Sequence, residues 1–176
     1  MGDPQSDLIA TLAQRHSDIV GVKLTCGSVA KITRLAAVLP KERFAVFGGQ
    51  SDFILGGLTS GSSGCIAAFA NVFPRTIAQI YQLYQRGRYD EALALHQKAA
   101  LAEQPIKAGI AATKYAAAIH SAKYAGIENA VALLKPRRPY FEPAAIKEKV
   151  RSTMAEVAEI EQSLGSASNP RARLQI

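Results

Sequence analysis

Three short apolar segments, separated by amphipathic helical patterns, constrain the fold more strongly than any other feature of this sequence. The predicted strands are residues 19–25, 44–47 and 64–68, which begin about 20–25 residues apart. Helical periodicity precedes the first strand and fills both intervals between strands. Parallel strands need a crossover of about this length, usually a helix. The alternation therefore predicts an α/β fold with a parallel sheet.

Capping residues indicate where the helices of this first part begin. Asp3 and Pro4 suit the start of a helix over residues 3–16. Ser28 can cap a second helix, and Ser51 can cap a short third helix that runs through Leu58. Each interval between the predicted strands thus holds one helix.

The rest of the sequence is predicted to be helical. Pro74 suits a first helical turn, Gly87 ends that helix, and Asp90 can cap the next one. An Ala-rich helix follows Gly109 and is predicted to end near Gly126.

The last part of the chain contains a proline-bearing segment and one more helix. Residues 135–143 hold three prolines and are predicted to be extended. A helix is predicted from about 144 to 164, and residues 165–176 are predicted to be a flexible tail.

Composition indicates a single folded domain rather than a disordered chain. The sequence has 176 residues, of which 48% are hydrophobic, which is enough to bury a core. Its two cysteines, Cys26 and Cys65, give no disulfide framework and indicate reduced thiols. No apolar run reaches the roughly 18 residues of a membrane-spanning helix. Residues 1–18 resemble neither a signal peptide nor an Arg-rich presequence. We therefore expect a cytoplasmic location and no membrane partner.

The positive charge of the chain is spread along its length. The net charge is +7, with 10 basic and 7 acidic residues in 1–100 and 11 and 7 in 101–176. Only Lys135–Arg138 resembles a basic cluster, and one short cluster is not the basic stripe of a nucleic-acid-binding protein. Nucleic-acid binding is therefore disfavoured, while small anionic substrates are compatible with this surface.

The first predicted strand carries one lysine among apolar residues. Side chains alternate between the two faces of a strand, so Lys23 shares a face with Gly21, opposite an aliphatic face. Burial of an ammonium group lowers its pKa from about 10.4 and makes the amine a nucleophile that can form a Schiff base. Gly21 would leave room for the adduct. The alternative is that the ammonium of Lys23 reaches solvent at the end of the strand, and the local sequence alone favours this alternative.

Other candidate sites are weaker. The glycines of Gly48–Gly49 and Gly61–Gly64 could let a ligand approach the backbone, but simple turn geometry explains them as well. No P-loop or dinucleotide-binding glycine motif is present. His16, His96 and His120 lie on separate predicted helices without a second ligand at metal spacing, so a metal site is disfavoured.

Three motifs together resemble the second half of the dihydrodipicolinate synthase / N-acetylneuraminate lyase family of class I aldolases. Asp18–Thr25 looks like the sixth barrel strand of that family, and Phe47–Asp52 looks like the end of the seventh. Ser63–Pro74 looks like the eighth strand and the entry to its helix. The likeness is strongest to the fungal branch of 4-hydroxy-2-oxoglutarate and 2-keto-3-deoxy-sugar-acid aldolase-like proteins.

The resemblance implies a site and a fold. Lys23 would be the catalytic lysine that forms a Schiff base with pyruvate or another 2-oxo acid. Ile66 would line the substrate pocket, and Gly48 would border it through its backbone. No metal or organic cofactor is implied, since the lysine itself provides the electron sink. The implied fold is part of a (β/α)8 barrel over residues 1–86, then a C-terminal helical appendage at 87–164 and a tail at 165–176.

The sequence also departs from the family pattern. A closed barrel needs eight strands and about 250 residues, whereas only three strands are predicted. The Gly-Thr-Thr/Ser-Gly-Glu loop that holds the 2-oxo acid carboxylate and the Tyr-Asn-x-Pro tyrosine that relays protons are both missing. Three strands would leave open edges and an uncovered face, which favour association.

These departures leave two main hypotheses. The first is a truncated aldolase-type lyase that works as a homo-oligomer or with a complementing chain. The second is a non-catalytic protein, derived from the barrel, that acts by association.

Overall fold

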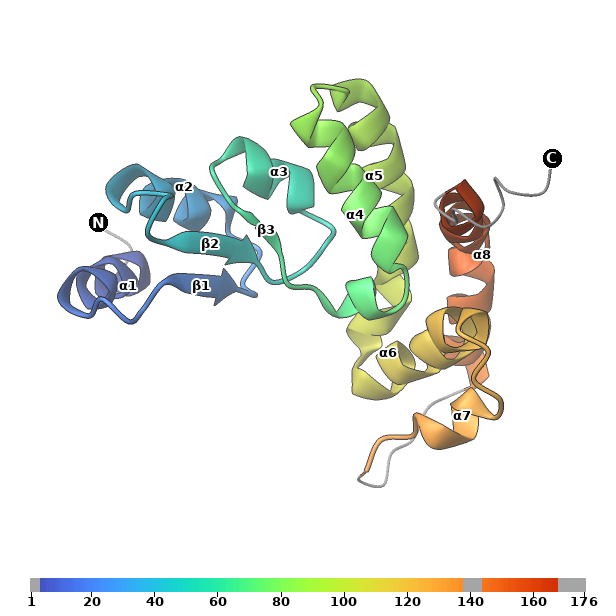
Figure 1. The fold of residues 1–176 in the computed structure, drawn as a ribbon. Coiled ribbons are helices and arrows are strands. Elements are labelled where there is room, and N and C mark those ends of the chain that lie inside the picture. Colours follow the sequence, from blue (N-terminus) through green and yellow to red (C-terminus); the bar gives the residue numbers. More distant parts are fainter. Residues whose placement is uncertain (1–3, 138–143, 168–176) are drawn as a thin grey trace. The chain divides into compact units, whose positions relative to one another are not determined.

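The computed structural model describes residues 4–137 and 144–167, which form two compact units. The first unit comprises residues 1–67 and the second residues 68–176. The first contains the sheet, and the second contains only helices among its described residues (Figure 1). No helix of the described residues is long and apolar enough to cross a membrane.

The first unit alternates helices and parallel strands. Its elements are, in order, α1 (Pro4–Arg15), β1 (Gly21–Leu24), α2 (Val29–Val38), β2 (Ala45–Gly48), α3 (Ile54–Thr59) and β3 (Gly64–Cys65). The strand order is β1-β2-β3, with both pairs parallel. The predicted α/β class and the three parallel strands are therefore confirmed.

Helices cover one face of this sheet. Leu24 and Val46 lie in a buried cluster with residues of α1 and α2, and Val22 packs against it. The members that α2 and the segment after it contribute are Ile32, Leu35, Leu39 and Phe44. The aliphatic face predicted for β1 is therefore the face that packs on the helices.

Two helix starts in the first unit differ in how they are capped. The Ser28 hydroxyl accepts a hydrogen bond from the Lys31 backbone amide at 3.2 Å, as predicted for the N-cap of α2. The prediction for Ser51 is wrong, because α3 begins two residues later, after Phe53, without a side-chain cap. The backbone carbonyl of Ser51 instead accepts a hydrogen bond from Ile54 N at 3.2 Å, which closes a turn before the helix.

The third strand is shorter than predicted. It comprises only Gly64–Cys65, and Ala68–Asn71 form a 3-10 turn, η1. The reason is that its partner β2 ends at Gly48, so the last ladder bond is from Ile66 N to the Gly48 carbonyl, 2.8 Å. Within the described residues, no strand lies beside the chain beyond Ile66 for it to pair with.

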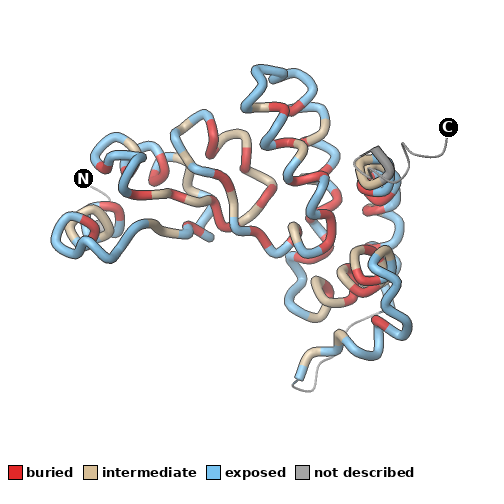
Figure 2. Tube along the Cα trace, in the orientation of Figure 1, coloured by how far each residue is buried: buried red, intermediate tan, exposed pale blue. Residues whose placement is uncertain are grey.

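The second unit is a set of packed helices. Its long helices are α4 (Pro74–Gln85), α5 (Tyr89–Glu103) and α8 (Ala144–Ala167). Between them lie the short elements η2 (Gln104–Ala108), α6 (Ile110–Ala117), the π-helical segment η3 (Ala118–Ala122) and α7 (Ala130–Leu133). Buried positions recur along α4 and α5 (Figure 2), as the periodicity predicts.

Three predictions for this unit need correction. Asp90 does not cap α5, because the N-cap is Arg88 and Asp90 lies in the first turn. The Ala-rich helix is interrupted, because α6 passes into the π-helical segment η3. Helix α8 continues to Ala167, three residues past the predicted end. Of the segment predicted to be extended, residues 138–143 lie outside the described residues, as do residues 168–176 of the predicted tail.

The compact units divide the chain at a different place from the predicted domains. The prediction groups residues 1–86 by their resemblance to a barrel, and the division into 1–86, 87–164 and 165–176 stays a prediction. By contact, α4 belongs with the helical unit, because it packs against α5 and α8.

A buried carboxylate joins the C-terminal helix to the start of α4. Glu161 of α8 is 1% exposed. It accepts hydrogen bonds from the backbone amides of Arg75 and Thr76, at 3.0 and 2.7 Å, and from the Thr76 hydroxyl at 2.8 Å. These amides belong to the first turn of α4, whose donors have no partner within the helix. A negative charge is also favourable at a helix N-terminus. Glu161 therefore caps a helix more than 80 residues away in sequence.

A buried histidine lies in the π-helical segment. His120 is 8% exposed, and its ring lies 4.8 Å from that of Phe73 and 6.3 Å from that of Tyr124, centroid to centroid. Its Nε2 is buried without a hydrogen-bond partner in the structure. Burial, assisted by the positive charge of Lys123, lowers the pKa of His120 from 6.5 to about 4. The imidazole is therefore neutral in the folded protein at neutral pH.

We predict that Glu161→Ala destabilises the helical unit by about 3 kcal/mol, because it leaves the buried amide and hydroxyl of Thr76 and the partly buried amide of Arg75 without an acceptor. Glu161→Gln should cost less, because one side-chain oxygen remains. The measurement is urea unfolding followed by far-UV circular dichroism. Glu159→Ala, which removes an exposed carboxylate from the same helix, should change stability by less than about 0.5 kcal/mol. Equal effects at the two positions would contradict the capping role.

We predict that the stability of the helical unit falls as the pH drops from about 6.5 to 4. In this range the unfolded chain protonates His120, whereas the folded chain, with a pKa of about 4, does not. The loss should reach about 2 kcal/mol, less than the full shift implies because the ring keeps some solvent contact. His120→Phe should remove this component from a pH series of urea midpoints. His16→Gln, at an exposed position, should leave it unchanged.

Candidate functional site

The predicted site residues lie at the carboxyl ends of the three strands. Lys23 is the penultimate residue of β1, Gly48 is the last residue of β2, and Ile66 directly follows β3. In a parallel sheet these ends meet at one edge, where α/β proteins usually bind ligands. The structure therefore brings the three residues together on neighbouring strands of one unit.

Backbone pairing fixes the register of this edge. Lys23 pairs with Phe47, Leu24 with Gly48, and Gly48 with Cys65. Beyond the last paired residues, Gly49 N donates to the Leu24 carbonyl at 2.7 Å, and Ile66 N donates to the Gly48 carbonyl at 2.8 Å. The strand ends are thus held side by side by the backbone itself.

The pairing also assigns side chains to faces. Lys23 and Phe47 are partners and share a face, and Phe47 is in turn the partner of Gly64. Ile66 lies two residues beyond Gly64, so it belongs to the same face. This face is opposite to the one that carries Leu24 and packs on the helices. It therefore carries the ammonium group of Lys23, an aromatic ring and an aliphatic side chain.

Gly48 can contribute only its backbone to this face. A Cβ built on Gly48 would point to the helix-covered side and lie 2.8 Å from the ring of Phe53. Glycine is needed there because Phe53 packs directly over the strand. The carbonyl oxygen of Gly48 accepts the hydrogen bond from Ile66 N and keeps a second lone pair.

The residues of the first unit do not enclose Lys23. Its side chain is exposed, and that of Ile66 is 50% exposed. In this chain the ammonium group thus reaches solvent, as the alternative interpretation expects. The desolvation that a Schiff-base lysine needs is not provided by the described residues of the unit that carries it.

Gly21 has a different role from the predicted one. A Cβ at this position would lie 2.7 Å from the carbonyl oxygen of Ala45 on β2. Gly21 therefore permits close approach of two strands. Its position on the same face as Lys23 is as predicted, but the space beside it is occupied by the neighbouring backbone.

Sequence reasoning missed the contact between Gly49 and Thr25. A Cβ on Gly49 would lie 2.5 Å from the Thr25 Cα and 2.8 Å from its N. The side-chain amide of Gln50 also donates, through Nε2, to the Thr25 carbonyl at 3.3 Å. The segments that follow β1 and β2 are therefore packed backbone to backbone. The doubled glycine after a strand was the available signal.

The described residues give no support to the remaining candidate sites. Gly61 and Gly64 have φ values of +95° and +142°, so turn geometry accounts for both. In the part of the chain that the structure describes, no group of three or more His, Cys, Asp or Glu side chains could hold a metal ion. Among the described residues, neither Cys26 nor Cys65 is part of a disulfide.

Parallel strands alternating with helices, with polar and backbone groups gathered at the carboxyl edge, are the arrangement of a segment of a (β/α) barrel. The model of the dihydrodipicolinate synthetase family matches residues 4–157. The chain belongs to this family, which confirms the resemblance.

Curated relatives and one solved structure agree with this assignment. A Coccidioides immitis protein named for mitochondrial 4-hydroxy-2-oxoglutarate aldolase is 63% identical over 163 residues, which are 92% of this chain and 52% of that protein. An L-threo-3-deoxy-hexylosonate aldolase of Hypocrea jecorina is 38% identical, and the match spans 92% of this chain and 51% of that protein. A crystal structure of a dihydrodipicolinate synthase family protein from Coccidioides immitis matches with a TM-score of 0.85 and 63% identity, over 89% of this chain and 51% of that one. The chain thus spans about half the length of the relatives it matches.

The expectation of a cytoplasmic location is wrong. The Coccidioides immitis relative is named as mitochondrial, and so is a probable 4-hydroxy-2-oxoglutarate aldolase of Emericella nidulans. The Emericella nidulans protein is 38% identical over 93% of this chain and 50% of its own length. The absence of an Arg-rich pattern in residues 1–18 was therefore a poor guide to location.

We predict that Gly49→Ala destabilises the first unit by about 2 kcal/mol, because the added methyl group would overlap the Thr25 backbone, which cannot move without shifting β1. The measurement is a urea titration that follows amide signals of β1 and β2. Gly56→Ala is the matched control. Gly56 lies within helix α3, and a Cβ on it would lie 3.4 Å from a methyl carbon of Val29 in α2, which is an ordinary contact. The substitution should therefore be neutral or stabilise the unit by up to about 1 kcal/mol. A neutral Gly49→Ala would show that the strand ends are not tightly packed.

Proposed function

We propose that this chain supplies the lysine-bearing part of a class I aldolase that acts on a 2-oxo acid. The observation that carries the proposal is the position of Lys23 at the carboxyl end of β1, on the face that the helices leave open. Gly48 and Ile66 lie on the neighbouring strands at the same edge. Membership in the dihydrodipicolinate synthetase family supports this role.

In the proposed reaction, the uncharged amine of Lys23 attacks C2 of the 2-oxo acid. The carbonyl oxygen takes up protons and leaves as water, and an iminium ion remains. When the C3–C4 bond breaks, its electron pair moves toward the iminium nitrogen, and the 4-hydroxyl group loses its proton and becomes an aldehyde. Protonation of the enamine at C3 and hydrolysis then release pyruvate and the free lysine. The reverse sequence forms the same bond.

Ile66 and Gly48 have binding roles in this proposal. Ile66 lies on the same face as Lys23 and provides an apolar wall for the substrate carbons. The free lone pair of the Gly48 carbonyl can accept a hydrogen bond from the substrate or from a water molecule.

The remainder of the site is proposed to come from sequence that this chain does not contain. The chain covers about half of its relatives. The 176 residues contain neither the carboxylate-binding loop nor the proton-relaying tyrosine that the resemblance to the family leads us to expect. A partner bearing these groups would also cover Lys23 and lower the dielectric around it, which favours the uncharged amine.

The names of the relatives support a proposal for the substrate and the location. We infer a 4-hydroxy-2-oxo acid or a 3-deoxy-2-oxo sugar acid as substrate, because the relatives are named for such compounds. We infer a mitochondrial location for the same reason. The proposed partners are pyruvate or a related 2-oxo acid and either a second copy or a complementing chain.

Exposed apolar side chains favour association as a second candidate function. β1 is an edge strand of the described sheet. Leu8 of α1 and Val20, just before β1, are 59% and 64% exposed. An open strand edge beside exposed aliphatic groups can pair with another chain. The same surface would serve a non-catalytic association protein, so a covalent test of Lys23 is needed to separate the two.

We predict that borohydride reduction in the presence of pyruvate converts Lys23 into carboxyethyl-lysine. The chain is mixed with the part of the Coccidioides immitis relative that it does not cover, and the adduct is located by peptide mass spectrometry. The mixture should be modified far more than the chain alone, because only the mixture buries Lys23. Lys23→Arg should abolish the adduct. Lys41→Arg, at an exposed position away from the strands, should not reduce it.

Two results would contradict this function. One is a mixture that forms a stable complex but gives no adduct on Lys23, which would favour the association protein. The other is modification spread evenly over the exposed lysines, which would show that Lys23 has no special reactivity.

A further inference from the structure

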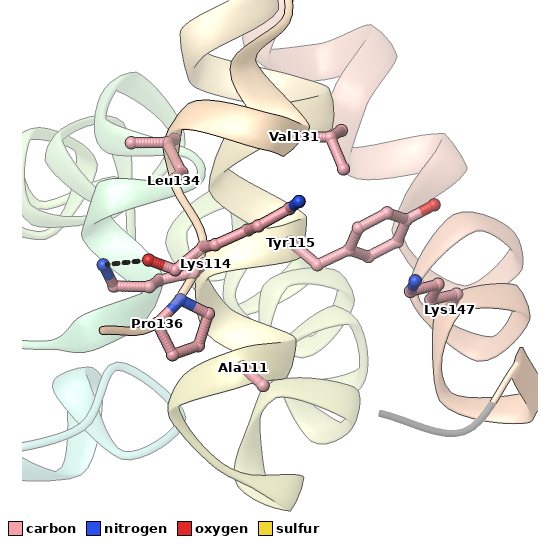
Figure 3. A pocket seen from close by; sticks show the side chains of 8 residues that line it. Ala111, Lys114, Tyr115, Val131, Leu134, Pro136 and Lys147 are labelled. Atoms are coloured by element: carbon pink, nitrogen blue, oxygen red, sulfur yellow. Dashed lines mark hydrogen bonds between the residues drawn. The ribbon is translucent and has the colours of Figure 1, made fainter. Parts of the chain in front are cut away.

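A small pocket in the helical unit gathers three lysines. Lys114 comes from α6, Lys135 follows α7, and Lys147 comes from α8. Figure 3 shows the pocket between these elements, with Tyr115 on the side next to α8. None of its lining residues carries a negative charge. All of the lining lies within one compact unit.

Contacts of the described residues position the side chains of Lys114, Lys147 and the nearby Arg151. Lys114 Nζ donates to the Lys135 carbonyl at 3.4 Å (Figure 3). Lys147 Nζ and the Arg151 guanidinium lie 5.4 and 5.7 Å from the centre of the Tyr115 ring, at cation–π distance. Tyr115 itself is only 7% exposed, so it forms a fixed wall against which the cations rest.

Among the described residues, no ion pair with a carboxylate balances the positive charge of the lysines that line the pocket. Glu148 follows Lys147 in sequence, but it pairs with Arg151 at 3.3 Å and is largely exposed. In the described part of the chain, none of the three lysines has an ion-pair partner. Three lysines thus border one pocket, and each of their positive charges attracts an anion that enters it.

The remaining lining and the size of the pocket define what can enter. Val131, Leu134 and Pro136 are apolar, so they strengthen electrostatic attraction inside the pocket. The cavity volume is about 20 Å³, which is space for one water-sized group. An oxygen atom of an acid group fits this volume, while the rest of the ligand must stay at the mouth.

We infer that this pocket binds the acid group of a small oxyanion, a carboxylate or a phosphate. The site is separate from the one around Lys23 and does not depend on the proposed function. Lysines bind such groups as point charges, each with three hydrogen-bond donors.

The test is a titration of the isotope-labelled chain with inorganic phosphate, followed by amide NMR spectra at constant ionic strength with chloride as the replaced anion. Saturable shifts should appear at Lys114, Tyr115 and Lys147. The double variant Lys135→Gln/Lys147→Gln should weaken binding at least about tenfold. Lys149→Gln is the matched control, because it removes the same charge from an exposed position on the same helix that does not line the pocket. It should change the affinity by less than about twofold.

A parallel titration with acetate distinguishes the two acid groups. Saturation by phosphate alone assigns the pocket to phosphate groups, and saturation by acetate assigns it to carboxylates. Shifts that do not saturate, or that weaken equally in the double variant and in Lys149→Gln, would mean an adventitious ion only and would overturn the proposal. If the double variant loses helix content, Lys135→Gln alone decides the question, because Lys135 is exposed and lies outside the helices.

Discussion

Two backbone hydrogen bonds at the ends of the strands hold the candidate site together. Gly49 N bonds to the carbonyl of Leu24, and Ile66 N bonds to the carbonyl of Gly48. They join three neighbouring strands at the point where the ladder ends. Because Gly49 also lies against the Thr25 backbone, no side chain can enter between the segments that leave β1 and β2. The position of Lys23 relative to Ile66 therefore depends on glycine and on backbone geometry rather than on contacts between their side chains.

The sequence was sufficient to predict the sheet and the edge on which the site residues lie. A period of two assigns Lys23 to the face opposite the helices, and the spacing of the strands makes them parallel. The extent of β3 could not be predicted, because it is set by where its partner strand ends. The cap predicted for α3 failed for a related reason. Ser51 has the right side chain, but its carbonyl closes a turn with Ile54 N, and α3 begins only after Phe53, whose ring packs against Gly48.

The helical unit shows the same limit over longer distances. Periodicity predicts which faces of its helices are buried. No local pattern indicates that Glu161 would cap α4, since its partners lie more than 80 residues away. Nor does the Ala-rich sequence reveal the π-helical turn that places His120 beside Phe73. Both polar groups are buried, but they differ in whether they have hydrogen-bond partners. The Glu161 carboxylate accepts three hydrogen bonds and joins two helices. The Nε2 atom of His120 has no partner in the structure, and the lowered pKa of the buried ring makes the fold sensitive to acid.

The exposure of Lys23 is the main physical constraint on its chemistry. An ammonium group in water stays protonated at neutral pH, and a protonated amine cannot attack a carbonyl carbon. The strand supplies the position of the nucleophile, but its reactivity requires desolvation or nearby positive charge. The described residues around Lys23 supply one aromatic and one aliphatic neighbour on its face and leave the side chain in solvent. Burial by a partner surface would activate the amine and also cover the open face and edge of the sheet. In the proposed function catalysis and association would therefore be linked, because the contact that completes the sheet would also be the contact that activates Lys23.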